Sequence, residues 1–175
     1  MKNLLKLAPL CACLLAVASA VLLMVTPALT HSYQVLGKTV NDFYSAFAVI
    51  FGNGPAVLLS ISTTFEGSAS WSALLAWVFV LASAVLLLVS TIASFVKAKS
   101  VLRFAGLIAL LSAGLLIAGG IFLFFTKSTF YTANGYSVTD DGYGLGFGWI
   151  LAAIFALAGG VFSILPATVA LVSKK

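Results

Sequence analysis

The sequence predicts an all-α membrane protein: a four-helix transmembrane bundle with a small β-sheet cap on its outer side. Three observations support this prediction. The chain of 175 residues is 62% apolar and only 7% charged, with a mean hydropathy of +1.20, whereas soluble domains carry roughly 25% charged residues. Four segments reach the roughly 20 apolar residues that a spanning helix needs. The charged residues lie almost entirely outside these segments.

The expected spans cover about residues 4–29, 71–96, 101–126 and 147–172 of a single membrane domain, 1–175. Helices are expected because a spanning segment must satisfy its own backbone hydrogen bonds in lipid. The alternative for the first span is a cleaved signal peptide, since Ala18-Ser19-Ala20 has the small residues that a signal peptidase accepts. The apolar run continues to Val25, and this length favours a span.

The basic residues predict the orientation. Seven of the nine Lys and Arg residues lie at the chain start, between the second and third spans, and at the chain end. All four acids lie in the two loops 30–70 and 127–146. Because Lys and Arg accumulate on the cytoplasmic side, we expect both termini in the cytoplasm and both loops outside a cell membrane. The seven basic residues are Lys2, Lys6, Lys97, Lys99, Arg103, Lys174 and Lys175; the acids are Asp42, Glu66, Asp140 and Asp141.

The first outer loop has two alternative structures. Residues 43–51 and 57–65 are apolar and partly β-branched, and Gly52-Asn53-Gly54-Pro55 separates them, which favours a hairpin. The rival is an amphipathic helix with Thr39 and Asp42 as a capping box and Phe43, Phe47, Ile50 and Phe51 on one face. We favour strands slightly.

The second outer loop also predicts a hairpin. Asn134-Gly135 separates residues 129–133 from 136–139, and Asn-Gly between alternating residues is a strong hairpin signal. Strands from both loops then form the cap. The aromatic residues expected to build it are Phe43, Phe47, Phe51, Phe130, Tyr131 and Tyr136. Aromatic residues expected near the outer membrane interface are Trp71, Trp149, Tyr131 and Tyr143.

Small residues recur at every fourth position in the first and last spans. Such ladders let helix backbones approach closely, and close packing drives helix association in lipid. We expect them to be helix-packing positions, within the bundle or between protomers. They are Ala8, Ala12, Ala16 and Ala20 in the first span, and Gly144, Gly148, Ala152, Ala156 and Gly160 in the last.

The interiors of the predicted spans contain none of the ionisable groups that mark proton relays, ion paths and substrate sites. Lys6 and Arg103 lie near the ends of their spans. A stripe of hydroxyls could still line a path, although such groups commonly bond back to their own helix. The lone histidine, His31, favours a solvated interfacial position over a metal site. We therefore expect no catalytic residue, no metal site and no cofactor. The stripe consists of Ser83, Ser90, Thr91, Ser94 and Ser112.

Two resemblances concern most of the chain. Its four spans, loop sizes and expected outer sheet resemble the architecture of claudins, although no Trp, Gly-Leu-Trp or cysteine pair occurs between Thr30 and Ser70. The Lys-rich start, the Ala-Val-Ile-Phe-Gly run at 48–52 and the basic turn at 97–103 are similar to small uncharacterised four-span membrane proteins of Gram-positive bacteria. The second resemblance implies a bacterial plasma membrane and no particular activity.

These observations predict a non-enzymatic accessory, scaffold or interaction subunit that works through its packing faces and outer cap. The alternative is a transporter or channel component for a neutral or weakly charged solute. The expected partners are the lipid bilayer and either another membrane protein or a second copy of the chain. Nucleic acid is not expected, because the basic residues flank apolar spans.

Overall fold

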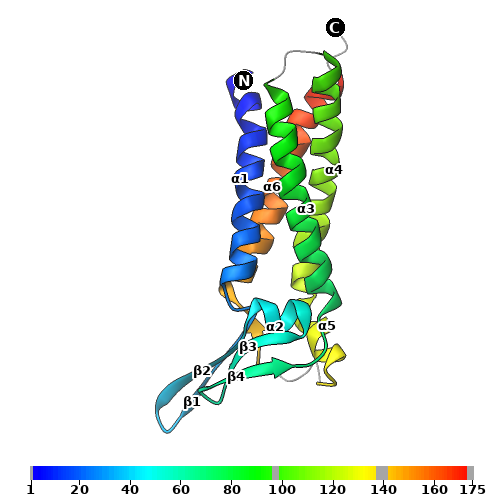
Figure 1. The fold of residues 1–175 in the computed structure, drawn as a ribbon. Coiled ribbons are helices and arrows are strands. Elements are labelled where there is room, and N and C mark those ends of the chain that lie inside the picture. The colour runs from blue at the N-terminus through cyan, green and yellow to red at the C-terminus, as the bar shows by residue number, and fades with distance from the viewer. Residues whose placement is uncertain (1, 96–98, 137–141, 173–175) are drawn as a thin grey trace.

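Four long helices stand on a small sheet in the computed structural model, which describes residues 2–95, 99–136 and 142–172 (Figure 1). The helices are α1 (Lys2–Val25), α3 (Trp71–Ser94), α4 (Lys99–Phe124) and α6 (Phe147–Val172). Each contains a stretch long and apolar enough to cross a membrane. The prediction of four helices long and apolar enough to span a membrane is therefore confirmed.

The first helix ends earlier than predicted. Helix α1 stops at Val25, and the amide of Ala28 already donates to the Tyr44 carbonyl at 2.9 Å. Pro27 explains the early end, because a proline disfavours helical backbone at the residue before it, here Thr26. The chain thus passes from membrane helix to sheet within three residues.

The helices form a ring in which α1 and α4 each contact α3 and α6. The first residues of α1 and the last residues of α6 lie at the end of the bundle away from the sheet (Figure 1). Helices α4 and α6 approach closely at two glycines. A Cβ atom on Gly120 would lie 2.9 Å from the Leu157 side chain, and one on Gly160 would lie 2.7 Å from Ile117.

The sheet has five antiparallel strands in the order β4-β3-β2-β1-β5. Strand β5 comes from the second loop and pairs with β1, so both loops build the sheet, as predicted. The sheet together with two short helices, α2 (Ala46–Phe51) and α5 (Thr126–Ala133), is called the cap below. The strands are β1 (Leu29–Val35), β2 (Lys38–Tyr44), β3 (Asn53–Leu58), β4 (Ile61–Glu66) and β5 (Gly144–Leu145).

Two details of the first loop were predicted wrongly. The favoured strand at 43–51 is helix α2 from Ala46 onward. Ser45 caps its start by accepting from the Ala48 amide at 3.3 Å, and Gly52 ends it with φ +75° and an amide that donates to the Ala48 carbonyl. The rival interpretation is right that residues 46–51 are helical but wrong about the start of the helix, because Thr39 and Asp42 lie in β2.

The glycine-rich run at 52–55 does not form the hairpin turn of the first loop. Strand β3 begins at Asn53, and the turn to β4 lies at Leu59-Ser60, where φ is +52° and +62°. A second hairpin, β1–β2, turns at Leu36-Gly37 with φ +52° and +78°, and our sequence analysis missed it. Two residues with positive φ match the right-handed twist of the paired strands.

The hairpin predicted around Asn134-Gly135 is also wrong. Residues 126–133 form α5, and Gly135, with φ +73°, terminates it. The Tyr136 amide donates to the Tyr131 carbonyl at 2.9 Å, and the Gly135 amide donates to the Thr132 carbonyl at 3.4 Å, as in a Schellman motif. Glycine in the left-handed region ends a helix as readily as it turns a hairpin. Residues 137–139 of the predicted second strand lie outside the described residues.

Candidate binding site in the cap

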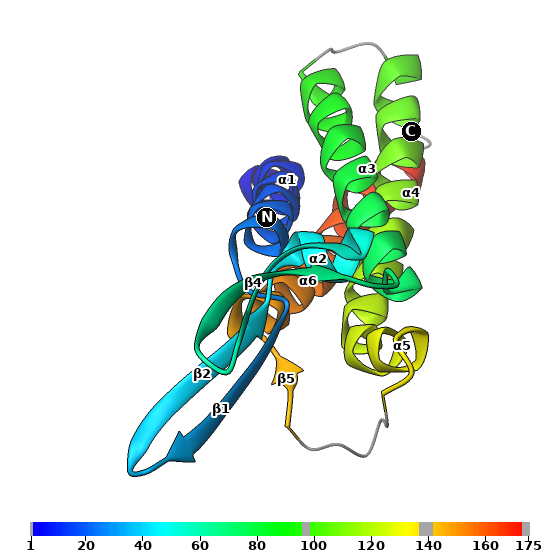
Figure 2. The same cartoon turned by 60° about the horizontal axis from the view of Figure 1, so that its bottom comes forward.

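One face of the sheet carries most of its aromatic residues. His31 and Asp42 are directly opposite each other on β1 and β2, and so are Leu29 and Tyr44. Side chains alternate between the two faces of a strand, so His31, Asp42 and Tyr44 share a face. In the view of Figure 2, strand β5 lies between β1, with which it pairs, and helix α5, which it also contacts.

The buried ring of Tyr44 is the centre of an aromatic cluster. Its centroid lies 5.1 Å from those of Phe65 and Phe130 and 5.3 Å from that of Tyr143. The Phe65 and Phe130 rings are 5.3 Å apart. These tilted and edge-to-face arrangements are the favourable ones for aromatic pairs, and they join β2, β4, α5 and the segment before β5.

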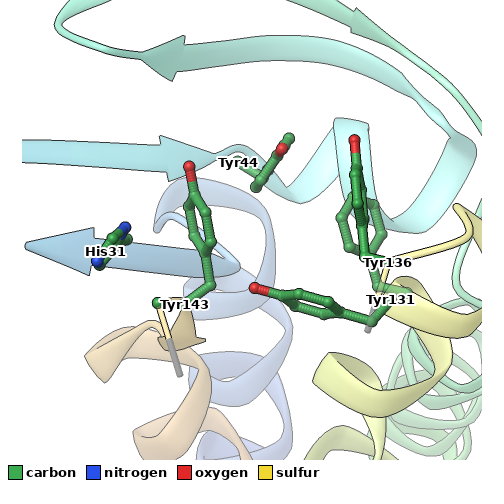
Figure 3. Close-up of a pocket in the computed structure, with 7 residues that line it drawn as sticks. His31, Tyr44, Tyr131, Tyr136 and Tyr143 are labelled. Atoms are coloured by element: carbon green, nitrogen blue, oxygen red, sulfur yellow. The ribbon is translucent and has the colours of Figure 1, made fainter. Parts of the chain in front are cut away.

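A pocket of about 330 Å³ opens beside this cluster. Figure 3 shows Tyr143 and Tyr136 upright on its two sides, with the Tyr131 ring lying between them and Tyr44 behind. Four of the five tyrosines in the chain thus line one pocket. The described residues that line it are His31, Tyr44, Phe130, Tyr131, Tyr136, Gly142 and Tyr143.

Two phenols of the pocket, those of Tyr44 and Tyr143, have a raised pKa. Burial, followed by the electrostatic effect of Asp42, raises the pKa of Tyr143 to about 12. Burial, followed by the neighbouring phenols, raises the pKa of Tyr44 well above its ordinary value. The ammonium of Lys127 lies 5.7 Å from the centroid of the Tyr131 ring, which is a cation–π contact.

Asp42 is nearly fully buried and organises the sheet beside the pocket. Its carboxylate accepts from the Leu59 amide at 2.9 Å and from the Ser60 amide at 3.3 Å, and the Tyr33 hydroxyl lies 3.4 Å away. Leu59 and Ser60 form the turn with positive φ, so the carboxylate pairs two amides that the turn exposes. Asp42 therefore has a structural role, and its charge also reaches the pocket through Tyr143.

Helix α5 is fixed to the start of α3 by hydroxyl groups. Thr129 Oγ1 lies 2.5 Å from Ser70 Oγ and 2.7 Å from Ser72 Oγ. Ser70 also caps α3 by accepting from the Ala73 amide at 3.3 Å. These contacts place Phe130, the next residue, against the aromatic cluster.

The predicted cap residues have three different positions. Phe130 and Tyr131 are buried and line the pocket, and Tyr136 lines it while remaining 47% exposed. Phe47 and Phe51 are on the exposed side of α2, 6.0 Å apart. Phe43 alternates with Tyr44 and therefore lies on the opposite face of the sheet.

The aromatic residues expected at the interface also differ among themselves. Trp71 is 55% exposed at the cap end of α3, as an interfacial residue would be. Trp149, by contrast, is completely buried in the core. Tyr131 is buried and Tyr143 half-buried in the pocket wall, so these two face the cap and not the lipid.

The small-residue ladders lie inside the bundle, except at one position. The alanines of both ladders are buried. Gly148 lies against Thr26, whose side chain occupies the space that a Cβ would need. Gly144 departs from the prediction: it lies in β5, three residues before α6, and nothing within 4 Å would meet its Cβ.

The hydroxyl stripe bonds to helix carbonyls. Ser83 donates to the Phe79 carbonyl at 2.7 Å, Ser112 to that of Ile108 at 2.8 Å, and Thr91 to that of Leu87 at 2.7 Å. Ser90 donates across to Ala105 of α4 at 2.9 Å, and the Ser112 carbonyl lies 3.3 Å from Ser83. The hydroxyls of Ser83 and Ser90 thus link α3 to α4. The Ser94 side chain is not among those described.

Sequence reasoning did not find the pocket, because its lining comes from four separate segments. Alternation in β1 and β2 would have predicted that His31 and Tyr44 can share a sheet face. In the described part of the chain, no three His, Cys, Asp or Glu residues lie together as a metal site would require. Asp140 and Asp141 fall outside the described residues. The chain matches no protein-family model and no curated protein in the comparisons.

Proposed function

We propose that this chain is a multi-pass protein of a cell membrane and acts as a non-enzymatic accessory or interaction subunit through its cap. In this proposal both termini are cytoplasmic and the cap lies outside. The orientation is supported by the described basic residues Lys2, Lys6, Lys99 and Arg103, which lie in the first turns of α1 and α4, at the end of the bundle away from the sheet. It is also supported by exposed aromatic residues at the cap ends of helices, Trp71 and Phe147, which suit an interface.

The observation that carries the proposal is the contrast between the bundle and the cap. The bundle hydroxyls are bonded to helix carbonyls, and glycines bring α4 and α6 into contact, so the described part of the bundle offers little for a polar solute to bind. The cap holds an aromatic pocket of about 330 Å³, a volume within the range of ligand sites. This contrast supports an interaction subunit over a solute path through the helices.

Cysteine accessibility tests the bundle. In a background with Cys11→Ala and Cys13→Ala, the variants Ser83→Cys and Ser112→Cys are treated with a membrane-impermeant thiol reagent. We expect no labelling, because both side chains are buried. Ser62→Cys on exposed β4 is the positive control. Labelling at both bundle positions would overturn the proposal in favour of a water-filled path.

The same control tests the orientation. If the cap is outside, Ser62→Cys reacts in intact cells, whereas a cysteine added after Lys175 reacts only once the cells are permeabilised. The reverse order would overturn the orientation.

The interaction role predicts that a photoreactive residue at Leu36, the fully exposed tip of β1–β2, cross-links to a membrane protein. If photoreactive residues at this tip and at exposed Ile61 both failed to cross-link to any protein, the interaction role would be contradicted.

A further inference from the structure

The pocket in the cap presents aromatic ring faces from several directions. The Tyr131 and Tyr136 rings are 5.8 Å apart in a T-shaped arrangement, and Tyr44 and Tyr143 are 5.3 Å apart with planes inclined by 50°. In Figure 3, Tyr143 and Tyr136 flank the opening and Tyr131 lies between them. No Lys, Arg, Asp or Glu is among the residues that line it in the described part of the chain. This set of four tyrosines is called the tyrosine cage below.

The charge around the tyrosine cage favours a cation. Aromatic faces carry the negative part of the ring quadrupole and attract cations that lie within about 6 Å of the centroid. Lys127 already lies this way, 5.7 Å from the Tyr131 centroid, although it is not part of the pocket lining. Asp42 adds a buried negative charge nearby, opposite His31 on the adjacent strand. An anionic ligand would meet the ring faces and this carboxylate unfavourably.

Among the described residues that line the pocket there is no carboxylate, and this composition distinguishes between kinds of cation. A primary ammonium has three N–H donors and needs acceptors when it leaves water. The described lining offers phenol oxygens to such a group but no carboxylate, because Asp42, whose oxygens accept from the Leu59 and Ser60 amides, is not part of it. A quaternary ammonium has no donors to satisfy, and cages of aromatic rings are a common way to bind one.

We propose that the tyrosine cage binds a quaternary ammonium group, supplied by a free solute or by a lipid headgroup. The trimethylammonium group lies among the faces of Tyr131, Tyr136 and Tyr143, and the cavity leaves room for the atoms attached to it. This inference deepens the proposed function, because it names the ligand of the cap, and it rests on the cap being the interacting part of the chain.

The test uses the full chain, purified in a detergent without a choline headgroup, and two probes titrated by calorimetry. The probes are choline and its neutral isostere, in which carbon replaces the quaternary nitrogen. We expect choline to bind saturably and at least about tenfold more tightly than the isostere, because only the cation gains from the ring faces. Equal binding of the two probes, or no saturable choline binding, would overturn the proposal.

Matched variants separate the cage from the rest of the cap. Tyr136 and Phe47 are both 47% exposed aromatic residues of the cap, but only Tyr136 lines the pocket. Tyr136→Ala should weaken choline binding by about threefold to thirtyfold, and Phe47→Ala should leave it unchanged. Tyr143→Phe keeps the ring and should retain binding, whereas Tyr143→Leu should lose it. Equal effects of Tyr136→Ala and Phe47→Ala would contradict the cage.

Lipid nanodiscs distinguish the two sources of the ligand. If the headgroup is the ligand, free choline binds more weakly to the chain in phosphatidylcholine nanodiscs than in phosphatidylglycerol nanodiscs. If free choline binds with equal affinity in the two kinds of nanodisc, the ligand of the cage is a free solute. Either result requires that the cage binds choline. The choline test of the cage and the labelling test of the bundle can fail independently. If choline binds selectively but Ser83→Cys is labelled, only the proposal of a sealed bundle is overturned. A protected Ser83→Cys without choline selectivity would overturn the cage alone.

Discussion

Asn134 and Ser68 are joined by two reciprocal hydrogen bonds across 66 residues of sequence. The Ser68 amide donates to Asn134 Oδ1 at 2.8 Å, and Asn134 Nδ2 donates to the Ser68 carbonyl at 3.0 Å. The same Nδ2 lies 2.9 Å from the Phe130 carbonyl. One side chain therefore pairs with a backbone segment as a neighbouring strand would, and it fixes the end of α5 to the link between β4 and α3.

Replacing Asn134 should loosen this link. Asn134→Ala removes the partner of the Ser68 amide and carbonyl, and we expect it to lower the free energy of unfolding by about 1–3 kcal/mol. Denaturant titration in detergent measures this change, and amide exchange at Ser68 should accelerate. Asn53→Ala, at an exposed position of β3, is the control and should cost less than about 0.5 kcal/mol. Equal losses for the two variants would contradict the assigned role of Asn134.

Asp42 should be essential to the β3–β4 turn. Asp42→Ala leaves the Leu59 and Ser60 amides without their acceptor, and we expect a loss of about 1–3 kcal/mol with faster amide exchange at both residues. Asn-Gly adopts the positive φ values of such a turn more readily than Leu-Ser. The double change Leu59→Asn with Ser60→Gly should therefore recover part of the loss. An unchanged turn in Asp42→Ala, measured by exchange, would refute this role.

Glycines in the α4–α6 contact should respond differently from a glycine that faces open space. A Cβ on Gly160 would lie 2.7 Å from Ile117 and 3.1 Å from the Ala113 carbonyl, whereas nothing lies within 4 Å of one on Gly114. Gly114→Ala should stabilise the bundle by about 0.5–1 kcal/mol through helix propensity. Gly160→Ala should destabilise it by about 1–3 kcal/mol through overpacking. Unfolding titrations in detergent measure both, and a change of the same sign in the two variants would contradict the packing described.

The raised tyrosine pKa values predict a loss of stability at alkaline pH. Unfolded tyrosine ionises near its ordinary pKa of 10.0, whereas Tyr143 keeps its proton until about pH 12. Between these values the folded chain binds more protons than the unfolded one, so the free energy of unfolding falls as the pH rises; below about pH 10 this group contributes no slope.

Tyr143→Phe should make the alkaline decline shallower, and one late-ionising phenol should disappear from the tyrosinate absorbance titration. Tyr44, whose pKa is also raised, should remain late. If all five phenols of the unchanged chain ionised together near pH 10, the buried environment assigned to the cage would be wrong.

The spans could be predicted from the sequence because hydropathy acts on each segment by itself. Pro27 and the apolar run that begins at Trp71 are local signals in the sequence. The presence of the helices could therefore be predicted from composition and length. Helix ends were less accurate where the next element competes for the backbone, as the sheet does at Ala28.

The cap was predicted only as a small sheet from both loops, because its local signals allow two structures. Gly52 and Gly135 supply positive φ values that suit a hairpin turn and a helix end equally, and tertiary contacts decide between them. Gly52 lies where a Cβ would meet the Gly67 carbonyl, a partner 15 positions away that no local pattern reveals. The tyrosine cage has the same origin in distant segments.

The pairing of β1 with β5 has a mechanical consequence for the bundle. Leu29 follows α1 closely and Leu145 precedes α6 by two residues, and the two are paired across the strands. The Gly146 amide also donates to the Ala28 carbonyl at 2.8 Å. Helices α1 and α6 are thus joined at the cap end of the bundle. Separating them on this side would require breaking both the β1–β5 pairing and this hydrogen bond, so the sheet couples the two helices mechanically.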